Sequence, residues 1–219
     1  GVDYSNIEQV RIYDNQHQKF RDYKEASESI IKRLGLTPEN TVIDMGCGTG
    51  AFTLHAAKQC KRIYAVDVSK AMLEYCRQSS EQDNLNNIVF CHGGFLTYEH
   101  DAEPVDAMVC LAVLHHLPDF WKLVGLKRTF EMLKENGKLY LFDVVFPSEI
   151  DDYEIRFEDW VKLTAEEINQ DFASEVEIHI RDEYSTCDWI MEGLLRHAGF
   201  HIDSIQYTER FAATYICSK

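Results

Sequence analysis

The sequence predicts an α/β fold in which helices cover one doubly wound, mostly parallel sheet. Two observations predict this fold class. From residue 41 onward, short apolar runs typical of buried strands alternate with amphipathic segments of helical period. The chain has 219 residues, which suits one domain with a modest insertion. Such an alternation favours right-handed crossovers between parallel strands.

The N-terminal segment is expected to be helical over 5–34, as two helices or as one that bends near 19–22. Tyr13, His17 and Phe20 recur at helical spacing, and an apolar stripe continues behind them. Gly35 ends this run.

The central part of the chain is expected to hold five strands and three helices. The predicted strands are 41–46, 62–67, 87–91, 105–112 and 137–146, and the predicted helices are 49–59, 69–80 and 119–135. Ser69 and Asp119 are the expected N-caps of the second and third helix. Ligands of such sheets bind outside the carboxyl ends of the strands, so the residues after each strand are the first site candidates.

Residues 147–186 interrupt the alternation. An amphipathic helix is predicted over about 153–172, and a polar segment, 176–186, follows it. We interpret 147–186 as an insertion over the substrate end of the sheet. An ordinary helix packed on the domain edge explains the same pattern.

The most informative stretch follows the first predicted strand. After Asp44 come three glycines at alternate positions, Gly46, Gly48 and Gly50, and then a predicted helix. Glycines let the backbone turn sharply and approach a ligand closely, and the helix N-terminus offers free N–H groups. The carboxylate of Asp44 repels a pyrophosphate but tolerates a ligand with an ammonium or sulfonium group.

The composition narrows the range of partners. The net charge is −15, from 22 basic and 37 acidic residues, and the basic residues gather only in pairs such as Lys61-Arg62. This field repels nucleic acid, so no nucleic-acid partner is expected. No apolar run is long enough to cross a bilayer, so no membrane partner is expected either.

The seven cysteines show no C-x-x-C spacing, and their number is odd. This pattern argues against a zinc site or a disulfide framework, and no metal is expected. Several cysteines lie in apolar runs and are expected to be small core residues. Such thiols fit a reducing cytoplasm.

Four motifs in this order resemble those of the class I S-adenosylmethionine (SAM) dependent methyltransferases. The first, Asp44 to Gly50, is similar to the family motif D-x-G-x-G-x-G. The four stretches are 41–50, 62–69, 105–117 and 133–141. The resemblance implies a seven-stranded Rossmann-like sheet in one domain over 1–219, with SAM as cofactor and S-adenosylhomocysteine as product.

The resemblance also implies how the two ends of the chain are arranged. Residues 1–36 are expected to form a helical lid over the cofactor and substrate. At the other end, a helix capped by Ser185 or Thr186 is predicted to finish at Gly199. Strands near 201–207 and 211–217 are expected to follow it as an antiparallel hairpin.

The family pattern assigns roles to particular residues. Asp67 is expected to hold the ribose hydroxyls, and Asp44 to orient the loop or meet the ammonium group. Val68 and Met72 are expected to contact the adenine. The full set of expected cofactor residues is Asp44, Gly46, Cys47, Gly48, Gly50, Asp67, Val68, Met72, Gly94, Phe95 and Leu111.

One motif departs from the family pattern. Gly94 stands where many members place an aspartate that accepts a hydrogen bond from the adenine amino group. The backbone N–H of Phe95 can still donate to the adenine ring. The missing carboxylate puts adenine selectivity in question.

Chemistry is expected near a pair of histidines. His115 is expected to bond locally, while His116 either packs under the cofactor or takes a proton from an acceptor. Tyr13 is the second catalytic candidate. Asp143 is a lone acid in an apolar strand and needs a histidine, an acceptor group or an arginine as partner. The expected acceptor-binding residues are His17, Phe20, Asp143, Arg181, Glu183 and Tyr184. A solvated strand end explains the last three as well.

The predicted reaction transfers the sulfonium methyl to an O, N, S or C nucleophile of a small molecule by in-line displacement. The enzyme is expected to be a monomer or a homodimer. Two alternatives stay open. One is a SAM-binding sensor or scaffold without chemistry. The other is an NAD-dependent oxidoreductase, because Gly46-x-Gly48-x-x-Ala51, with Asp67 about 20 residues on, satisfies a loose dinucleotide pattern.

Overall fold

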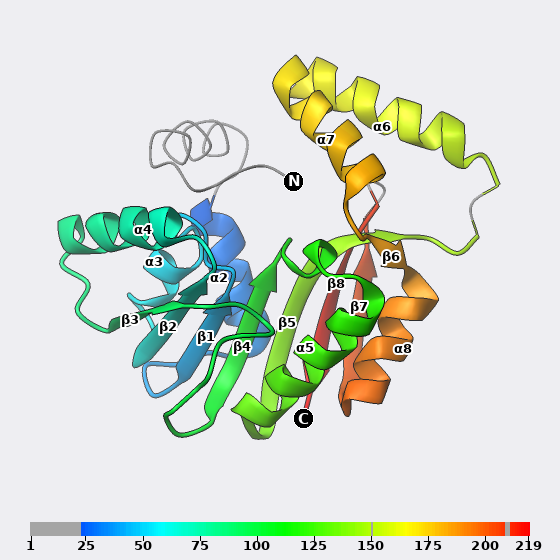
Figure 1. The fold of residues 1–219 in the computed structure, drawn as a ribbon. Coiled ribbons are helices and arrows are strands. Elements are labelled where there is room, and N and C mark those ends of the chain that lie inside the picture. The colour runs from blue at the N-terminus through cyan, green and yellow to red at the C-terminus, as the bar shows by residue number, and fades with distance from the viewer. Residues whose placement is uncertain (1–22, 150, 209–210) are drawn as a thin grey trace.

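A mostly parallel sheet forms the centre of the computed structural model, which describes residues 23–149, 151–208 and 211–219 (Figure 1). The strands run in the order β3-β2-β1-β4-β5-β8-β7. They are β1 (Thr41–Met45), β2 (Arg62–Asp67), β3 (Ile88–His92), β4 (Val105–Leu111), β5 (Leu133–Phe146), β7 (His201–Tyr207) and β8 (Ala212–Ser218). The pairs among β1 to β5 are parallel, while β8 is antiparallel to β5 and to β7. The doubly wound sheet and the C-terminal hairpin are therefore confirmed.

A short extra strand, β6 (Thr186–Cys187), pairs in parallel with the end of β5. Sequence reasoning assigned Ser185 or Thr186 as a helix cap, and this was wrong. The pairing of Thr186 with Val145 holds this segment extended, and helix α8 (Asp188–Ala198) begins only after Cys187, its N-cap. The predicted end of that helix is confirmed, since Gly199 has a φ of 110°.

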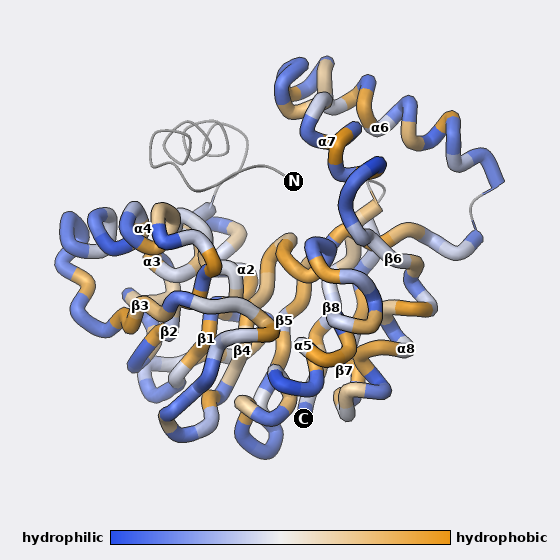
Figure 2. Tube along the Cα trace, viewed as in Figure 1, coloured by the Kyte–Doolittle hydropathy of each residue, from blue (hydrophilic) through white to orange (hydrophobic). Residues whose placement is uncertain are grey.

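Helices cover both faces of the sheet (Figure 1). The remaining helices are α2 (Tyr23–Leu34), α3 (Thr53–Ala56), α4 (Lys70–Gln82), the 3-10 turn η1 (Leu114–His116), α5 (Asp119–Met132), α6 (Tyr153–Glu167) and α7 (Gln170–Asp182). One core joins α5 and α8 to the sheet, and a second core joins α2 and α3 to the opposite face. Neighbouring residues of β1 divide between them, because Val42 and Ile43 point to opposite faces and both are fully buried. Figure 2 accordingly shows the strands as a mainly hydrophobic layer.

Two of the helices predicted for the central part of the chain differ from the structure. The helix expected over 49–59 is reduced to α3, because the glycine loop continues through a turn in which Gly50 N–H donates to the Cys47 carbonyl. Asp119 is the first residue of α5 and not its N-cap, which is Pro118. Its carboxylate accepts a hydrogen bond from Lys122 at 2.8 Å instead. Ser69 is confirmed as the N-cap of α4, since its hydroxyl accepts from the N–H of Met72.

The insertion is a helical hairpin that projects beyond the carboxyl ends of the strands (Figure 1). A single helix was predicted over 153–172, but the chain breaks at 168–169. There Asn169 caps α7 by accepting from the N–H of Phe172 at 2.8 Å. The polar segment, for which a solvated strand end was the alternative interpretation, is helical as far as Asp182. Within the described ranges, no helix combines the length and the apolar character that a membrane crossing requires.

Candidate functional site

The glycine loop leaves β1 in a conformation that side chains disfavour. The φ angles of Gly46, Gly48 and Gly50 are +78°, +53° and +93°. A Cβ at Gly46 would lie 2.4 Å from a methyl carbon of Val113, and one at Gly50 would lie 2.4 Å from the sulfur of Cys76. The loop therefore requires glycine both for its backbone angles and for its close packing.

Asp44 lies beneath this loop, 2% exposed. Its Oδ2 accepts a hydrogen bond from the hydroxyl of Thr53 at 2.6 Å. Burial raises the pKa of Asp44 to about 7, and the nearby charge of Asp67 adds to the shift while the Thr53 bond opposes it. Asp44 belongs to β1, and its bond to Thr53 ties that strand to α3. Its expected role, to orient the loop or to meet the ammonium group, stays a prediction.

Asp67 ends β2 and braces the loop from the other side. Its Oδ2 accepts from the N–H of Gly48 at 2.8 Å, and its Oδ1 accepts from the N–H of Ser69 at 2.7 Å. Each carboxylate oxygen has a second lone pair for a further donor. The predicted contact with the ribose hydroxyls stays a prediction, and the bond to Gly48 gives Asp67 a structural role that sequence reasoning missed.

The expected adenine end is built around Val68, whose exposed fraction is 69%. Met72, one turn along α4, is buried. A Cβ at Gly94 would lie 2.8 Å from a methyl carbon of Val68. An aspartate at position 94 would therefore require the exposed Val68 side chain to move aside. Phe95 is buried, and its carbonyl accepts from Arg128.

A cavity of about 610 Å³ opens beside the glycine loop. It gathers five of the expected cofactor residues: Asp44, Gly46, Cys47, Gly48 and Leu111. Its other walls were not predicted and include Ser27 and Ile30 of α2, Phe142 of β5 and Thr214 of β8. The helical period of α2 could have identified Ser27 and Ile30, because Ile30 belongs to the apolar stripe of that helix and Ser27 lies one turn before it.

The histidine pair lies on η1, at the carboxyl end of β4. His115 is buried, and its Nδ1 lies 2.5 Å from Oδ1 of Asp143, which is fully buried in β5. Asp143 also accepts from the backbone N–H groups of Leu114, His115 and Val144. Of the three partners considered for Asp143, the histidine is therefore correct and the arginine is wrong. The bond expected for His115 was a local one, whereas its side-chain partner Asp143 lies 28 residues further along the chain.

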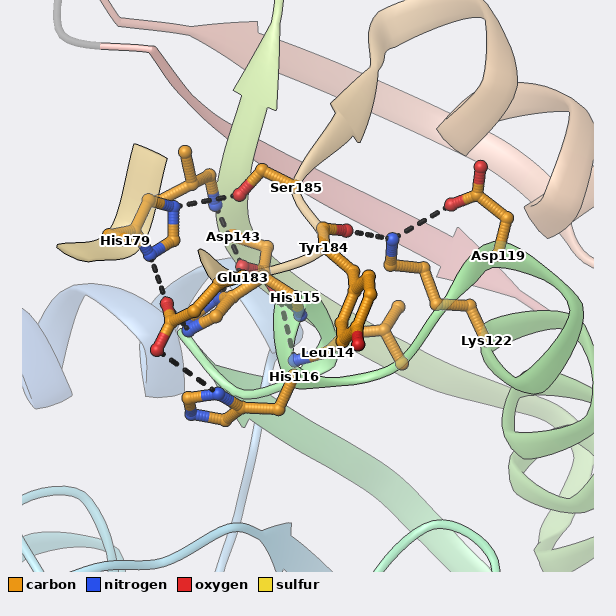
Figure 3. Close-up of polar contacts among 11 residues, drawn as sticks. Leu114, His115, His116, Asp119, Lys122, Asp143, His179, Glu183, Tyr184 and Ser185 are labelled. Carbon is orange, nitrogen blue, oxygen red and sulfur yellow. Dashed lines mark hydrogen bonds and ion pairs between the residues drawn. The ribbon is translucent and has the colours of Figure 1, made fainter. Parts of the chain in front are cut away.

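Glu183 joins this pair from the end of α7, as Figure 3 shows. One carboxylate oxygen, Oε2, lies 3.3 Å from Nε2 of His115 and contacts Nδ1 of His179. The other oxygen, Oε1, lies 3.5 Å from Nδ1 of His116. His179, which was noted only as part of a polar segment, thus becomes a central member of the cluster because α7 turns it inward.

The ionisable groups of this cluster shift one another's pKa values. The hydrogen bond from His179 lowers the pKa of Glu183 to about 2. Burial alone lowers the pKa of His115, but the charge and hydrogen bond of Asp143 prevail and raise it. Burial and the neighbouring His115 lower the pKa of His116, whose side chain is 46% exposed. His116 is therefore the member of the pair that is open to a ligand, and its lowered pKa favours the neutral imidazole.

The backbone of Tyr184 fixes Glu183 above the histidines (Figure 3). Its N–H donates to the carbonyl of His115 at 2.9 Å, and its own carbonyl accepts from the fully buried Lys122. The insertion is thus joined to both η1 and α5. The Tyr184 side chain is 53% exposed.

Other predicted acceptor residues do not join the cluster. Arg181 extends into solvent, 71% exposed, and pairs with Asp182. Its proposed contact with an acceptor carboxylate has no support in this arrangement. Tyr13, His17 and Phe20 lie outside the described residues.

Several known proteins that resemble this chain are named methyltransferases. A family model described as a methyltransferase domain matches residues 42–137. An uncharacterized methyltransferase of Anoxybacillus flavithermus is 26% identical over 175 residues, or 80% of this chain and 76% of that protein. One from Staphylococcus carnosus is 25% identical over 193 residues, or 88% and 86%. A SAM-dependent methyltransferase structure from Clostridium acetobutylicum has a TM-score of 0.71 at 16% identity, covering 96% of this chain and 97% of that one.

Proposed function

We propose that this chain, which belongs to the class I SAM-dependent methyltransferases, methylates a small molecule. SAM is its cofactor. The observation that carries the small-molecule proposal is the cover over the acceptor side. The α6–α7 hairpin lies beyond the strand ends and brings Glu183 to within 3.5 Å of His116 (Figure 3). A polar acceptor site beneath a projecting hairpin suits a compact substrate better than a long polymer.

The cavity beside the glycine loop supports the place of the cofactor. Its volume of about 610 Å³ is within the range of small-molecule sites, roughly 300 to 1,000 Å³. The methionine part of SAM would lie against Gly46 and Gly48, with its ammonium group near Asp44. Val113, the residue before η1, packs on Gly46, so the histidine pair lies beside the glycine loop.

The reaction moves a methyl group from sulfur to the acceptor. An acceptor lone pair forms the new bond to the methyl carbon, and the electrons of the C–S bond return to sulfur, which leaves S-adenosylhomocysteine. The sulfonium is already a good leaving group, so the protein mainly aligns the reactants and excludes water. His116 is the candidate for receiving a proton from the acceptor, because its side chain is half exposed while His115 is buried.

The surface charge supports a substrate other than nucleic acid. The net charge is −15. Several cations of the described segments are already paired with acids, namely Lys58 with Asp83, Arg128 with Glu99, Lys134 with Asp106, Arg181 with Asp182 and Arg196 with Glu192. These pairs weaken the attraction for phosphate that a nucleic-acid substrate requires.

Calorimetric titration and methyl labelling test the proposal in two stages. Purified chain is titrated with SAM, S-adenosylhomocysteine and NAD, with Asp67→Ala as the variant. We expect binding of the first two ligands, none of NAD, and loss of binding in Asp67→Ala. Labelled SAM is then incubated with a low-molecular-weight cell extract and, separately, with total RNA.

The distribution of label decides the substrate class. Incorporation into small molecules, reduced in His116→Gln but not in the matched surface variant His201→Gln, supports the proposal. Label in RNA, with none in the extract, contradicts it. Binding of SAM without any transfer would instead favour a sensor.

A further inference from the structure

We propose that His115, His179 and Glu183 form a binding site for a first-row divalent transition metal such as Zn²⁺ or Fe²⁺. Each residue offers one ligand atom, and these atoms lie within 4.8 Å of one another. Two ligand atoms that are each about 2.1 Å from one ion are at most roughly 4.2 Å apart. One ion between the three side chains therefore requires a small rearrangement, in which the most distant ligand atoms approach and Nδ1 of His179 moves away from the Glu183 oxygen that it contacts.

The donor set fits this class of metal. Imidazole nitrogens favour Zn²⁺, Fe²⁺ and their neighbours, whereas Mg²⁺ and Ca²⁺ prefer an all-oxygen set. Two histidines and one carboxylate are typical of catalytic metal sites, where they leave at least one position for a further ligand.

The outer nitrogens of both histidines are already held. Nδ1 of His115 bonds Asp143 at 2.5 Å, and Nε2 of His179 bonds the hydroxyl of Ser185 at 2.7 Å (Figure 3). These bonds leave Nε2 of His115 and Nδ1 of His179 facing inward, toward the same carboxylate oxygen of Glu183. A second shell that fixes each ring and directs its free nitrogen inward is typical of metal-binding histidines.

The elements that carry the ligands are anchored independently of any ion. His115 belongs to η1, His179 to the last turn of α7, and Glu183 is the C-cap of that helix. The Tyr184 backbone ties the two elements together through its bond to the His115 carbonyl. The site is thus positioned by the fold before a ligand enters, which reduces the cost of binding.

The location connects the metal to the acceptor side. His116, adjacent to His115, contacts the other oxygen of Glu183 and is half exposed. If the proposed function holds, the open coordination position takes an oxygen of the acceptor. The metal site itself can be tested without SAM, so its failure and that of methyl transfer are distinguishable.

The test is a metal titration of the whole chain after treatment with a chelator. Calorimetry follows Zn²⁺ with Mg²⁺ as the contrast, and visible absorption follows Co²⁺ as a spectroscopic probe. We expect one Zn²⁺ per chain, no comparable Mg²⁺ binding, and a Co²⁺ spectrum without the thiolate charge-transfer band that cysteine ligands would give.

Variants assign the binding to these side chains. Glu183→Gln and His179→Ala are expected to abolish it, and Ser185→Ala to weaken it by about 10- to 100-fold. His201→Ala removes a histidine that is 81% exposed and lies 3.9 Å from an acid, so it is the matched control and is expected to bind like the wild type. Circular dichroism and SAM titration check that each variant folds.

A measurement on the unmodified chain keeps the proposal testable if a variant misfolds. Added Zn²⁺ is expected to shift the imidazole NMR signals of two histidines, and both shifts should grow in proportion to the amount of Zn²⁺ bound. Binding that survives in both ligand variants would mark an adventitious surface site, and absence of Zn²⁺ binding would leave the cluster as an ion-paired network. Either result overturns the proposal.

Discussion

The glycine loop and the histidine cluster both hold buried polar groups, but they stabilise them in different ways. In the loop, Asp44 and Thr53 are nine residues apart, and Asp67 bonds to N–H groups of the backbone. In the cluster, His115 and Asp143 are 28 residues apart, and Glu183 comes from the insertion. The loop is a nearly self-contained motif, whereas the cluster exists only when three separate elements are packed together.

This difference teaches what each region is sensitive to. The loop depends on backbone conformation, because glycine angles and N–H donors define it. The cluster depends on charge pairing, because removal of one ionic partner leaves another buried charge without compensation. Four changes test this contrast.

The largest effect is expected at Asp143, which is fully buried and bonded to His115 and three backbone N–H groups. Asp143→Asn should destabilise the metal-free chain by roughly 3 to 5 kcal/mol, because it breaks a buried ionic pair. Urea unfolding measures the change. The matched control is Asp106→Asn, whose partner Lys134 is 47% exposed and which should cost about 1 kcal/mol. Equal losses in the two variants would remove the contrast.

A backbone change in the loop should come next. Gly46→Ala introduces a Cβ 2.4 Å from Val113 at a φ of +78°. We therefore expect the free energy of unfolding to fall by roughly 2 to 4 kcal/mol and SAM binding to be lost. Gly48→Ala is the control, because its φ is also positive but no atom lies within 4 Å of the new Cβ. Its cost should be about 1 to 2 kcal/mol. Thermal unfolding measures the stability of both variants, and calorimetry measures their SAM binding. A Gly46→Ala variant with unchanged stability and binding would show that the loop can move away from η1 at little cost.

A pH effect is expected from Asp44. Its pKa rises from 3.8 to about 7 on folding because burial disfavours the carboxylate. The unfolded chain releases the Asp44 proton at a lower pH than the folded chain does. The stability that this proton contributes is therefore fully present below about pH 4 and is lost as the pH rises through about 7. The free energy of unfolding of the SAM-free chain should therefore decline between pH 5 and pH 8, and the decline should be smaller in Asp44→Asn. The difference between the two proteins isolates Asp44 from Asp67, whose pKa burial also raises. An identical pH profile in both would contradict the assignment.

The smallest effect is expected at Arg181, which pairs with Asp182 in solvent. Arg181→Ala should leave both the melting temperature and the rate of methyl transfer unchanged. A steady-state assay on the identified acceptor checks this, with Lys162→Ala of α6 as the surface control. A specific rise in KM for Arg181→Ala would restore its predicted role as an acceptor ligand and would extend the active region beyond the cluster.

The fold followed from the sequence where local pattern and tertiary context agree. Strand β2 is predicted and observed over the same residues, and Ser69 caps α4 as expected. The short α3 and the extended Thr186 were missed because a glycine turn and a pairing with β5 override the local helical preference. Asn169, a residue type that favours helix N-caps, was the unused signal for the break between α6 and α7.

The sequence by itself predicted the glycine loop, because Asp44, the glycines and Asp67 stand close together along the chain. The resemblance of this and three further motifs to a known family predicted the class of chemistry. Tertiary structure alone decided the histidine cluster. His115, Asp143 and Glu183 are far apart along the chain, and a sequence pattern does not encode which side chains will face one another across an insertion. Their meeting depends on how α7 docks on η1 through the Tyr184 backbone and Lys122, and long-range packing of this kind is visible only in the folded chain.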